Sequence, residues 1–127
     1  MNLEKIAFSF FIVLALTLNF GFFLGDIDNP DHHNVYELFA AIMVNLIATV
    51  LKFGERTQMG GVLLATSLVA DVELIVAAVV WAVVVHVTAT GLTPANMAVI
   101  VSLAGGAALA NAVSVVLLVV DITLPRH

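Results

Sequence analysis

The stretch VLLATSLVADVELIVAAVVWAVVVHVTAT, residues 62–90, decides the fold. It is 29 residues long, and its acidic side chains are Asp71 and Glu73. About 20 consecutive apolar residues suffice for a helix to cross the hydrocarbon core of a bilayer. The stretch therefore predicts a transmembrane helix that is somewhat longer than one perpendicular crossing.

Three further apolar runs flank this one, at residues 6–24, 36–53 and 94–120. Helix starts are predicted near Asn34, which has Glu37 three residues later, and at Thr93, which is followed by Pro94. The chain is 62% apolar and 10% charged, whereas soluble domains are about 45–50% apolar and about 25% charged. We therefore predict an all-α membrane protein with four transmembrane helices in a single domain covering residues 1–127.

Composition also excludes several classes of function. The chain has no cysteine, so disulfides and thiolate sites are excluded. A formal net charge of −5 with four Lys and Arg argues against a nucleic-acid partner. No nucleophile motif, phosphate loop or metal-spaced His/Cys cluster occurs. We expect neither enzymatic activity nor a cofactor. The expected partner is the lipid bilayer that surrounds the helices.

The basic residues predict the orientation of the chain. With four crossings, all of them fall on one side of the membrane: Lys5, Lys52, Arg56 and Arg126. Because Lys and Arg stay in cytoplasmic loops, the N- and C-termini are both predicted to be cytoplasmic. The acidic loop that holds Asp26, Asp28 and Asp31 would then lie outside, where it either attracts cations or is merely solvated.

Asp71 and Glu73 are the strongest functional candidates. A carboxylate at the centre of a transmembrane helix costs about 2.5–3.5 kcal/mol on insertion scales, so it is rarely found without a role or a partner. One interpretation is an ion or proton pathway, in which a cation compensates the charge. The alternative is structural: Asp71 lies near the cytoplasmic boundary, and Arg56 or Lys52 reaches it there.

Helical geometry separates the two acids. Side chains two residues apart point about 200° apart, so Asp71 and Glu73 cannot both face one lumen of a regular helix. A broken helix, with a re-entrant segment within residues 60–73, is the alternative. Asn45 and Asn111 are expected at a similar depth, where they either support the carboxylates or form interhelical hydrogen bonds without function.

Small residues recur at four-residue spacing in the last span, as Ser102, Gly106 and Ala110. Such spacing allows close approach of helices. We interpret it as helix packing, within one subunit or between subunits.

Three stretches carry a resemblance to a known family: LNFGFF (18–23), GDIDNP (25–30) and VNLIATVLKFG (44–54). The chain resembles a small, functionally uncharacterised family of bacterial four-span membrane proteins. The resemblance implies a multi-pass protein of the bacterial inner membrane, and it assigns no functional residue.

These features lead to one functional hypothesis with two alternatives. The leading hypothesis is a homo-oligomeric cation channel, in which Asp71 or Glu73 forms an intramembrane carboxylate ring supported by Asn45 and Asn111. The first alternative is a small proton-coupled transporter, and the second is an accessory subunit of another membrane protein. The transported species would be inorganic cations or protons.

Overall fold

The computed structural model describes residues 3–26 and 28–124. These residues form four long helices, α1 (Leu3–Phe23), α2 (Val35–Lys52), α3 (Gln58–His86) and α4 (Pro94–Thr123). One short 3-10 helix, η1 (Pro30–His32), lies between α1 and α2. The described residues contain no strand, which confirms the predicted all-α class with four helices.

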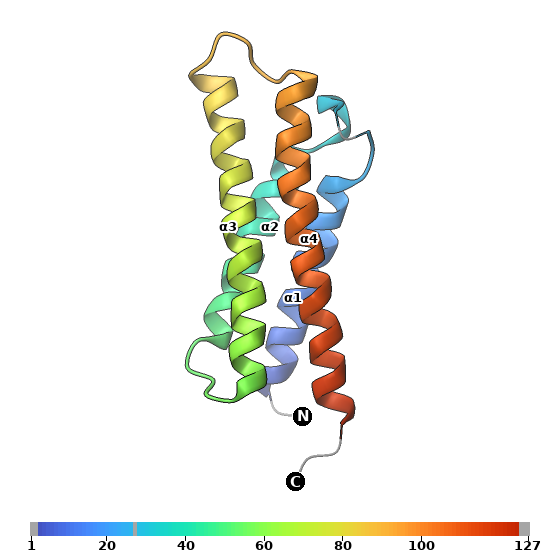
Figure 1. Ribbon diagram of the computed structural model, residues 1–127, viewed down its shortest axis with the longest axis vertical. Coiled ribbons are helices and arrows are strands. Elements are labelled where there is room, and N and C mark those ends of the chain that lie inside the picture. Colours follow the sequence, from blue (N-terminus) through green and yellow to red (C-terminus); the bar gives the residue numbers. More distant parts are fainter. Residues whose placement is uncertain (1–2, 27, 125–127) are drawn as a thin grey trace.

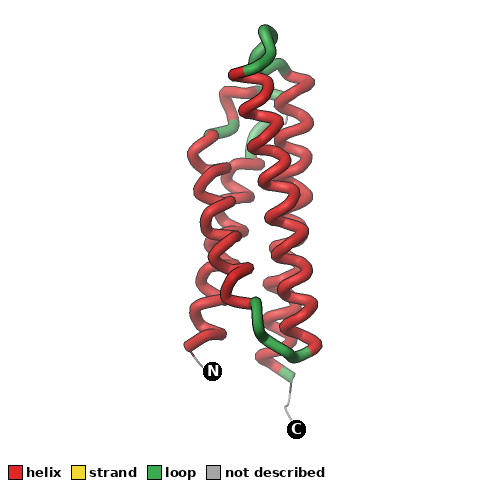
Figure 2. The backbone as a smooth tube through the Cα atoms, turned by 90° about the vertical axis from the view of Figure 1, so that its left-hand side faces the viewer, coloured by secondary structure: helices red, strands yellow, loops and turns green. Residues whose placement is uncertain are grey.

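The helices run alternately up and down in one bundle (Figure 1). Consecutive helices pack side by side, and α4 also packs against α1, so the four form a closed ring of neighbours. The ends of the described chain and the α2–α3 loop lie together at one end of the bundle, here called the terminal end (Figures 1 and 2). The α1–α2 and α3–α4 loops lie at the opposite, distal end.

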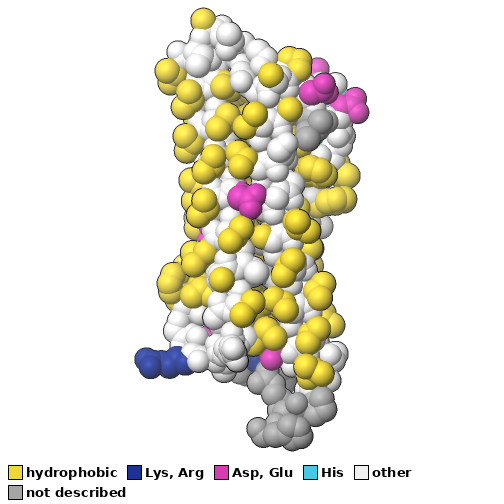
Figure 3. Space-filling model, viewed as in Figure 1, with side chains coloured by type: hydrophobic (Ala, Val, Ile, Leu, Met, Phe, Trp, Pro, Cys, Tyr) yellow, Lys and Arg dark blue, Asp and Glu magenta, His cyan; other side chains and the backbone are white. Residues whose placement is uncertain are grey.

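Each of the four helices is long and apolar enough to cross a membrane. Large apolar side chains are exposed along the outer surface, among them Phe10, Met43, Val72 and Leu109, and apolar side chains are spread along the whole length of the face seen in Figure 3. An outer surface of this kind is stable in lipid and is not found on a soluble monomer. The architecture indicates a multi-pass membrane protein.

The interior has two apolar clusters along the bundle axis. The cluster nearer the distal end includes Phe22, Leu38 and Met97, and the cluster nearer the terminal end includes Phe8 and Leu63. Buried polar side chains lie between these clusters, at Asn45, Thr49, Ser67, Asp71, Asn111 and Ser114. We call these six residues the polar layer. The bundle therefore carries a polar section halfway along a mainly apolar core.

Helix boundaries follow the capping residues. The Asn34 side chain accepts from Tyr36 N at 2.8 Å, and the Thr93 hydroxyl accepts from Asn96 N at 3.1 Å. Both caps confirm predicted helix starts. For α3 the predicted bounds, 62–90, are four residues too late at both ends. The helix starts earlier because Thr57 caps it and Gly60 and Gly61 are helical, and it ends at His86, with Val87 as its C-cap.

The re-entrant alternative for residues 60–73 is wrong. α3 is one continuous helix from Gln58 to His86. The physical reason is that the stretch from Val62 to Thr90 contains neither glycine nor proline, so nothing in it favours a break in the helix.

Candidate functional site

Asp71 lies inside the bundle, near the midpoint of α3. It is 4% exposed. Both carboxylate oxygens accept hydrogen bonds from α2: Asn45 Nδ2 donates to Oδ1 at 2.5 Å, and Thr49 Oγ1 donates to Oδ2 at 2.6 Å. The two donors are four residues apart on α2, so they lie on one face of that helix and hold the carboxylate between them.

The donors are themselves tied to the backbone. Asn45 Nδ2 also donates to the carbonyl oxygen of Ser67 at 3.1 Å, so the NH₂ group faces two acceptors on α3. The Thr49 hydroxyl lies 2.9 Å from the carbonyl oxygen of Asn45. These contacts fix the register of α2 against α3 at the level of Asp71.

No basic side chain of the described residues forms an ion pair with Asp71. Lys52 instead pairs with Glu55, with Nζ 3.1 Å from Oε2, and its Nζ lies 4.4 Å from the centre of the Phe8 ring. Arg56 is exposed in the α2–α3 loop. The structural alternative, in which Lys52 or Arg56 compensates Asp71, is therefore not the arrangement found.

Several buried polar atoms of the polar layer have no hydrogen-bond partner among the described residues. They are Asn45 Oδ1, Ser67 Oγ, Asn111 Oδ1 and Asn111 Nδ2. All three residues are fully buried. Because unsatisfied buried polar groups are rare, each of these atoms calls for a ligand or a partner.

Glu73 occupies a different environment, on the outer side of the α3–α4 pair. Its carboxylate lies against Gly106, and it borders a surface groove of about 420 Å³ with α4 residues that include Val99 and Ser102. Glu73 is partly buried rather than enclosed. Figure 3 shows an acidic patch halfway along the apolar face formed by α3 and α4. The predicted divergence of the two acids is confirmed.

The predicted supporting and packing residues have separate positions. Asn45 meets Asp71 directly, whereas the buried side chain of Asn111 on α4 forms no hydrogen bond within the described part of the chain. Of the small residues, Gly106 faces Glu73, Ala110 packs against the distal apolar cluster, and Ser102 is exposed. Gly106 thus lies in the contact between α3 and α4 within one subunit.

The acidic loop lies at the distal end, far from Asp71. Asp26, Asp28 and Asp31 are exposed there. The loop is anchored by His33, which is 5% exposed and has Nδ1 2.5 Å from the carbonyl oxygen of Phe22. Its Nε2 lies 2.7 Å from the carbonyl oxygen of Asp26.

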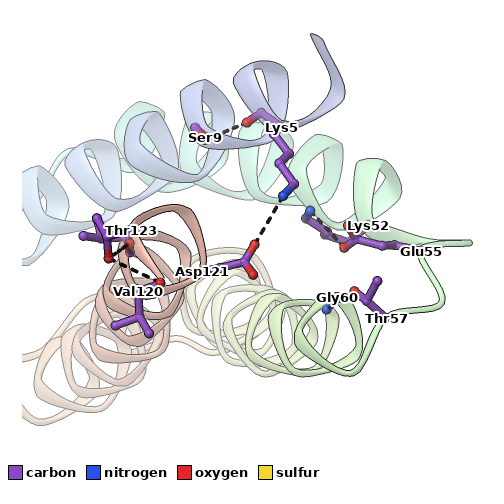
Figure 4. Close-up of polar contacts among 10 residues, drawn as sticks. Lys5, Ser9, Lys52, Glu55, Thr57, Gly60, Val120, Asp121 and Thr123 are labelled. Atoms are coloured by element: carbon purple, nitrogen blue, oxygen red, sulfur yellow. Dashed lines mark hydrogen bonds and ion pairs between the residues drawn. The ribbon is translucent and has the colours of Figure 1, made fainter. Parts of the chain in front are cut away.

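The terminal end carries the ion pairs. Lys5 of α1 and Asp121 of α4 approach with Nζ 3.5 Å from Oδ2, and Lys52 and Glu55 lie side by side at the end of α2 (Figure 4). Thr57 caps α3 at the same end by accepting from Gly60 N. These charged pairs lie together at the terminal end, close to the loop and chain ends rather than in the middle of the bundle.

Sequence reasoning missed Thr49 and Asn19. Thr49 lies four residues after Asn45, and this spacing was the signal that the two share a face. Asn19 is fully buried on α1 against α4, and in the amide orientation that satisfies both groups its nitrogen donates to Ala104 O at 2.9 Å and its oxygen accepts from Ala108 N at 3.0 Å.

Comparison with known proteins places the chain in a family. No curated protein and no solved structure matches it. A family model described as "Family of unknown function (DUF6394)" matches residues 32–122, which include α2, α3 and most of α4. The matched region holds Asp71 together with Asn45 and Thr49. The chain belongs to this family of unknown function.

Proposed function

We propose that the chain is a membrane transporter of protons or small monovalent cations, in which Asp71 binds the transported species. The observation that carries this proposal is a buried carboxylate at the centre of the bundle whose hydrogen-bond donors, Asn45 and Thr49, are both neutral. A negative charge at this depth is stable only if a cation or proton compensates it.

The depth of Asp71 fits a binding site halfway along a pathway. At about 1.5 Å per residue, Asp71 is about 20 Å from either end of α3. The site is thus remote from the charged groups at both ends of the bundle. A species held there, with apolar layers on both sides, is positioned to exchange with either side when the helices shift.

The burial of Asp71 also argues against a ring of this residue. Asp71 points into its own bundle, against α2. A ring at a subunit axis requires side chains on the outer surface, so Asp71 would bind its ligand within one subunit. The site therefore favours a transporter with one binding site per chain over the oligomeric ring of Asp71 suggested by the sequence.

Flux measurements on purified protein in liposomes test the proposal. Asp71→Asn removes the charge and preserves the size of the side chain, and we expect it to abolish cation and proton flux. Glu73→Gln is the matched control, because it removes the other acid of the same helix and should leave flux intact. Normal flux through folded Asp71→Asn protein would contradict the proposal.

A second candidate function rests on Glu73. Its position in a surface groove of α3 and α4 places it where subunits could meet, so an oligomeric cation channel would be lined by Glu73 rather than Asp71. In that case Glu73→Gln lowers flux and Asp71→Asn does not, and flux runs only down the gradient.

Absence of flux in wild-type protein, with co-purification of a second membrane protein, would instead favour an accessory subunit.

A further inference from the structure

The polar layer contains more oxygen atoms than the described hydrogen bonds use. Around Asp71 the Thr49 hydroxyl donates to the carboxylate, yet Asn45 Oδ1 and Ser67 Oγ are buried without a partner. Asn45 Oδ1 belongs to the same amide group whose nitrogen contacts Asp71. Ser67 lies four residues before Asp71 and so shares its face of α3. Unsatisfied oxygen atoms and one carboxylate thus occupy one buried location.

We propose that Asp71, Thr49, Asn45 and Ser67 form a binding site for a dehydrated alkali cation such as Na⁺ or K⁺. This inference rests on the proposed transport function and names its substrate class. The ligands are the Asp71 carboxylate, the hydroxyl oxygens of Thr49 and Ser67, and the side-chain oxygen Oδ1 of Asn45. All of them are oxygen atoms, which hard cations prefer. Rotation of the Asn45 amide exchanges the positions of Nδ2 and Oδ1, so Asn45 donates to the carboxylate in the empty site and presents its oxygen in the occupied site.

Charge balance selects a monovalent ion. The described residues contain no group of three or more His, Cys, Asp or Glu side chains that could hold a metal ion together. Asp71 is the one acidic residue of the polar layer, and one carboxylate neutralises one positive charge. A divalent cation would leave an uncompensated positive charge in the middle of the bundle, at high cost in free energy.

The unsatisfied oxygens distinguish an alkali cation from a proton. A proton on Asp71 neutralises the charge but provides one new donor, which satisfies one lone pair. Asn45 Oδ1 and Ser67 Oγ would not both gain a partner. A cation accepts lone pairs from all four groups at once, so it accounts for the charge and for the unsatisfied oxygens together.

Cation-dependent thermal stability of the purified full-length protein tests the site. The melting temperature is measured at fixed pH and ionic strength while NaCl or KCl replaces N-methylglucamine chloride. A specific ligand of the folded state raises the melting temperature with saturation. We expect such saturation for Na⁺ or K⁺ in the wild type and its loss in Asp71→Asn.

Ser67→Ala is the decisive variant, because it removes an unsatisfied hydroxyl without adding volume. If Ser67 binds a cation, the concentration that gives half-maximal stabilisation rises about five- to tenfold. If the hydroxyl is only a packing defect, the variant is equally or more stable and its cation response is unchanged, which overturns the proposal. Ser114→Ala is the matched control, since Ser114 is also buried but its hydroxyl is paired with Thr66.

The remaining outcomes separate this inference from the proposed function. Proton flux in alkali-free medium, without any effect of Na⁺ or K⁺ on melting, overturns the cation site and leaves the transporter in place. Saturable stabilisation without flux supports the site and contradicts transport. Equal stabilisation of the wild type, Asp71→Asn and Ser67→Ala is a general salt effect, and it overturns the inference.

Discussion

At the scale of single residues, two acids two positions apart have opposite environments. Asp71 is enclosed and receives hydrogen bonds from α2, whereas Glu73 borders a groove at the surface of α3 and α4. The difference follows from the helical repeat alone, since a two-residue step turns the side chain by about 200°. A substitution at either position therefore tests a different part of the molecule.

His33 is the residue whose replacement should most disturb the distal end. Its two ring nitrogens lie within hydrogen-bond distance of the carbonyl oxygens of Phe22 and Asp26, and Phe22 O is among the last carbonyls of α1, which lack helical partners. We expect His33→Ala to lower the free energy of unfolding by about 1–2 kcal/mol. Denaturant titration in detergent micelles measures the change.

His32→Ala is the control for this prediction. The His32 side chain is 41% exposed, and its Nδ1 accepts from Asp26 N at 2.8 Å. An exposed hydrogen bond competes with water, so we expect a smaller loss of stability for His32→Ala. Equal effects of the two substitutions would show that burial of His33 contributes nothing.

Sequence reasoning found part of the candidate site at the residue scale. Asp71 and Asn45 were predicted because a carboxylate and an amide are costly in lipid and therefore conspicuous there. Thr49 was missed because a threonine in an apolar helix ordinarily bonds its hydroxyl to its own helix backbone, and so needs no other partner. Only the structure shows that no basic side chain of the described residues pairs with Asp71. Sequence spacing alone does not determine whether the side chains of Lys52 and Arg56 reach Asp71 or point elsewhere.

At the scale of elements, the sequence predicted the number of helices correctly but located their ends less accurately. The apolar runs identified all four helices, and the caps at Asn34 and Thr93 located two of the starts. The start of α3 was placed too late, because Gly60 and Gly61 suggested a loop. In the structure Thr57 caps the helix ahead of them, and packing of α3 in the bundle outweighs the low helix propensity of glycine.

Gly105 sets the distance between α1 and α4. A Cβ atom at this position would lie 2.7 Å from Cε1 of Phe23, a ring that packs against the distal apolar cluster. We expect Gly105→Ala to lower the free energy of unfolding by about 1–3 kcal/mol, because the ring or the helix must move. Thermal unfolding in detergent micelles measures the effect.

Gly61→Ala is the matched control on α3. A Cβ atom there meets nothing within 4 Å, and alanine is the better helix former by up to about 1 kcal/mol. This variant should be neutral or more stable than the wild type. Destabilisation of both variants to the same degree would mean that close approach of α1 and α4 is not what Gly105 provides.

At the scale of the whole molecule, the up-down bundle gathers the described basic residues at one end, where they lie beside Glu55 and Asp121. The described basic residues Lys5, Lys52 and Arg56 all lie at the terminal end, whereas the exposed Asp26, Asp28 and Asp31 lie at the distal end. The fourth basic residue of the sequence, Arg126, lies outside the described residues. This one-sided distribution of Lys and Arg favours the predicted orientation, in which the terminal end is cytoplasmic.

Cysteine labelling can test that orientation directly, because the chain contains no cysteine of its own. Arg56→Cys places one thiol in the α2–α3 loop at the terminal end, and Asp28→Cys places one in the α1–α2 loop at the distal end. In spheroplasts treated with a membrane-impermeant maleimide, we expect Asp28→Cys to be labelled and Arg56→Cys to be labelled only after lysis. Removal of one basic residue leaves three, so the positive charges still favour the same orientation. Labelling of Arg56→Cys but not of Asp28→Cys in intact spheroplasts would contradict the assignment. Labelling of both variants would show that the chain inserts in two orientations.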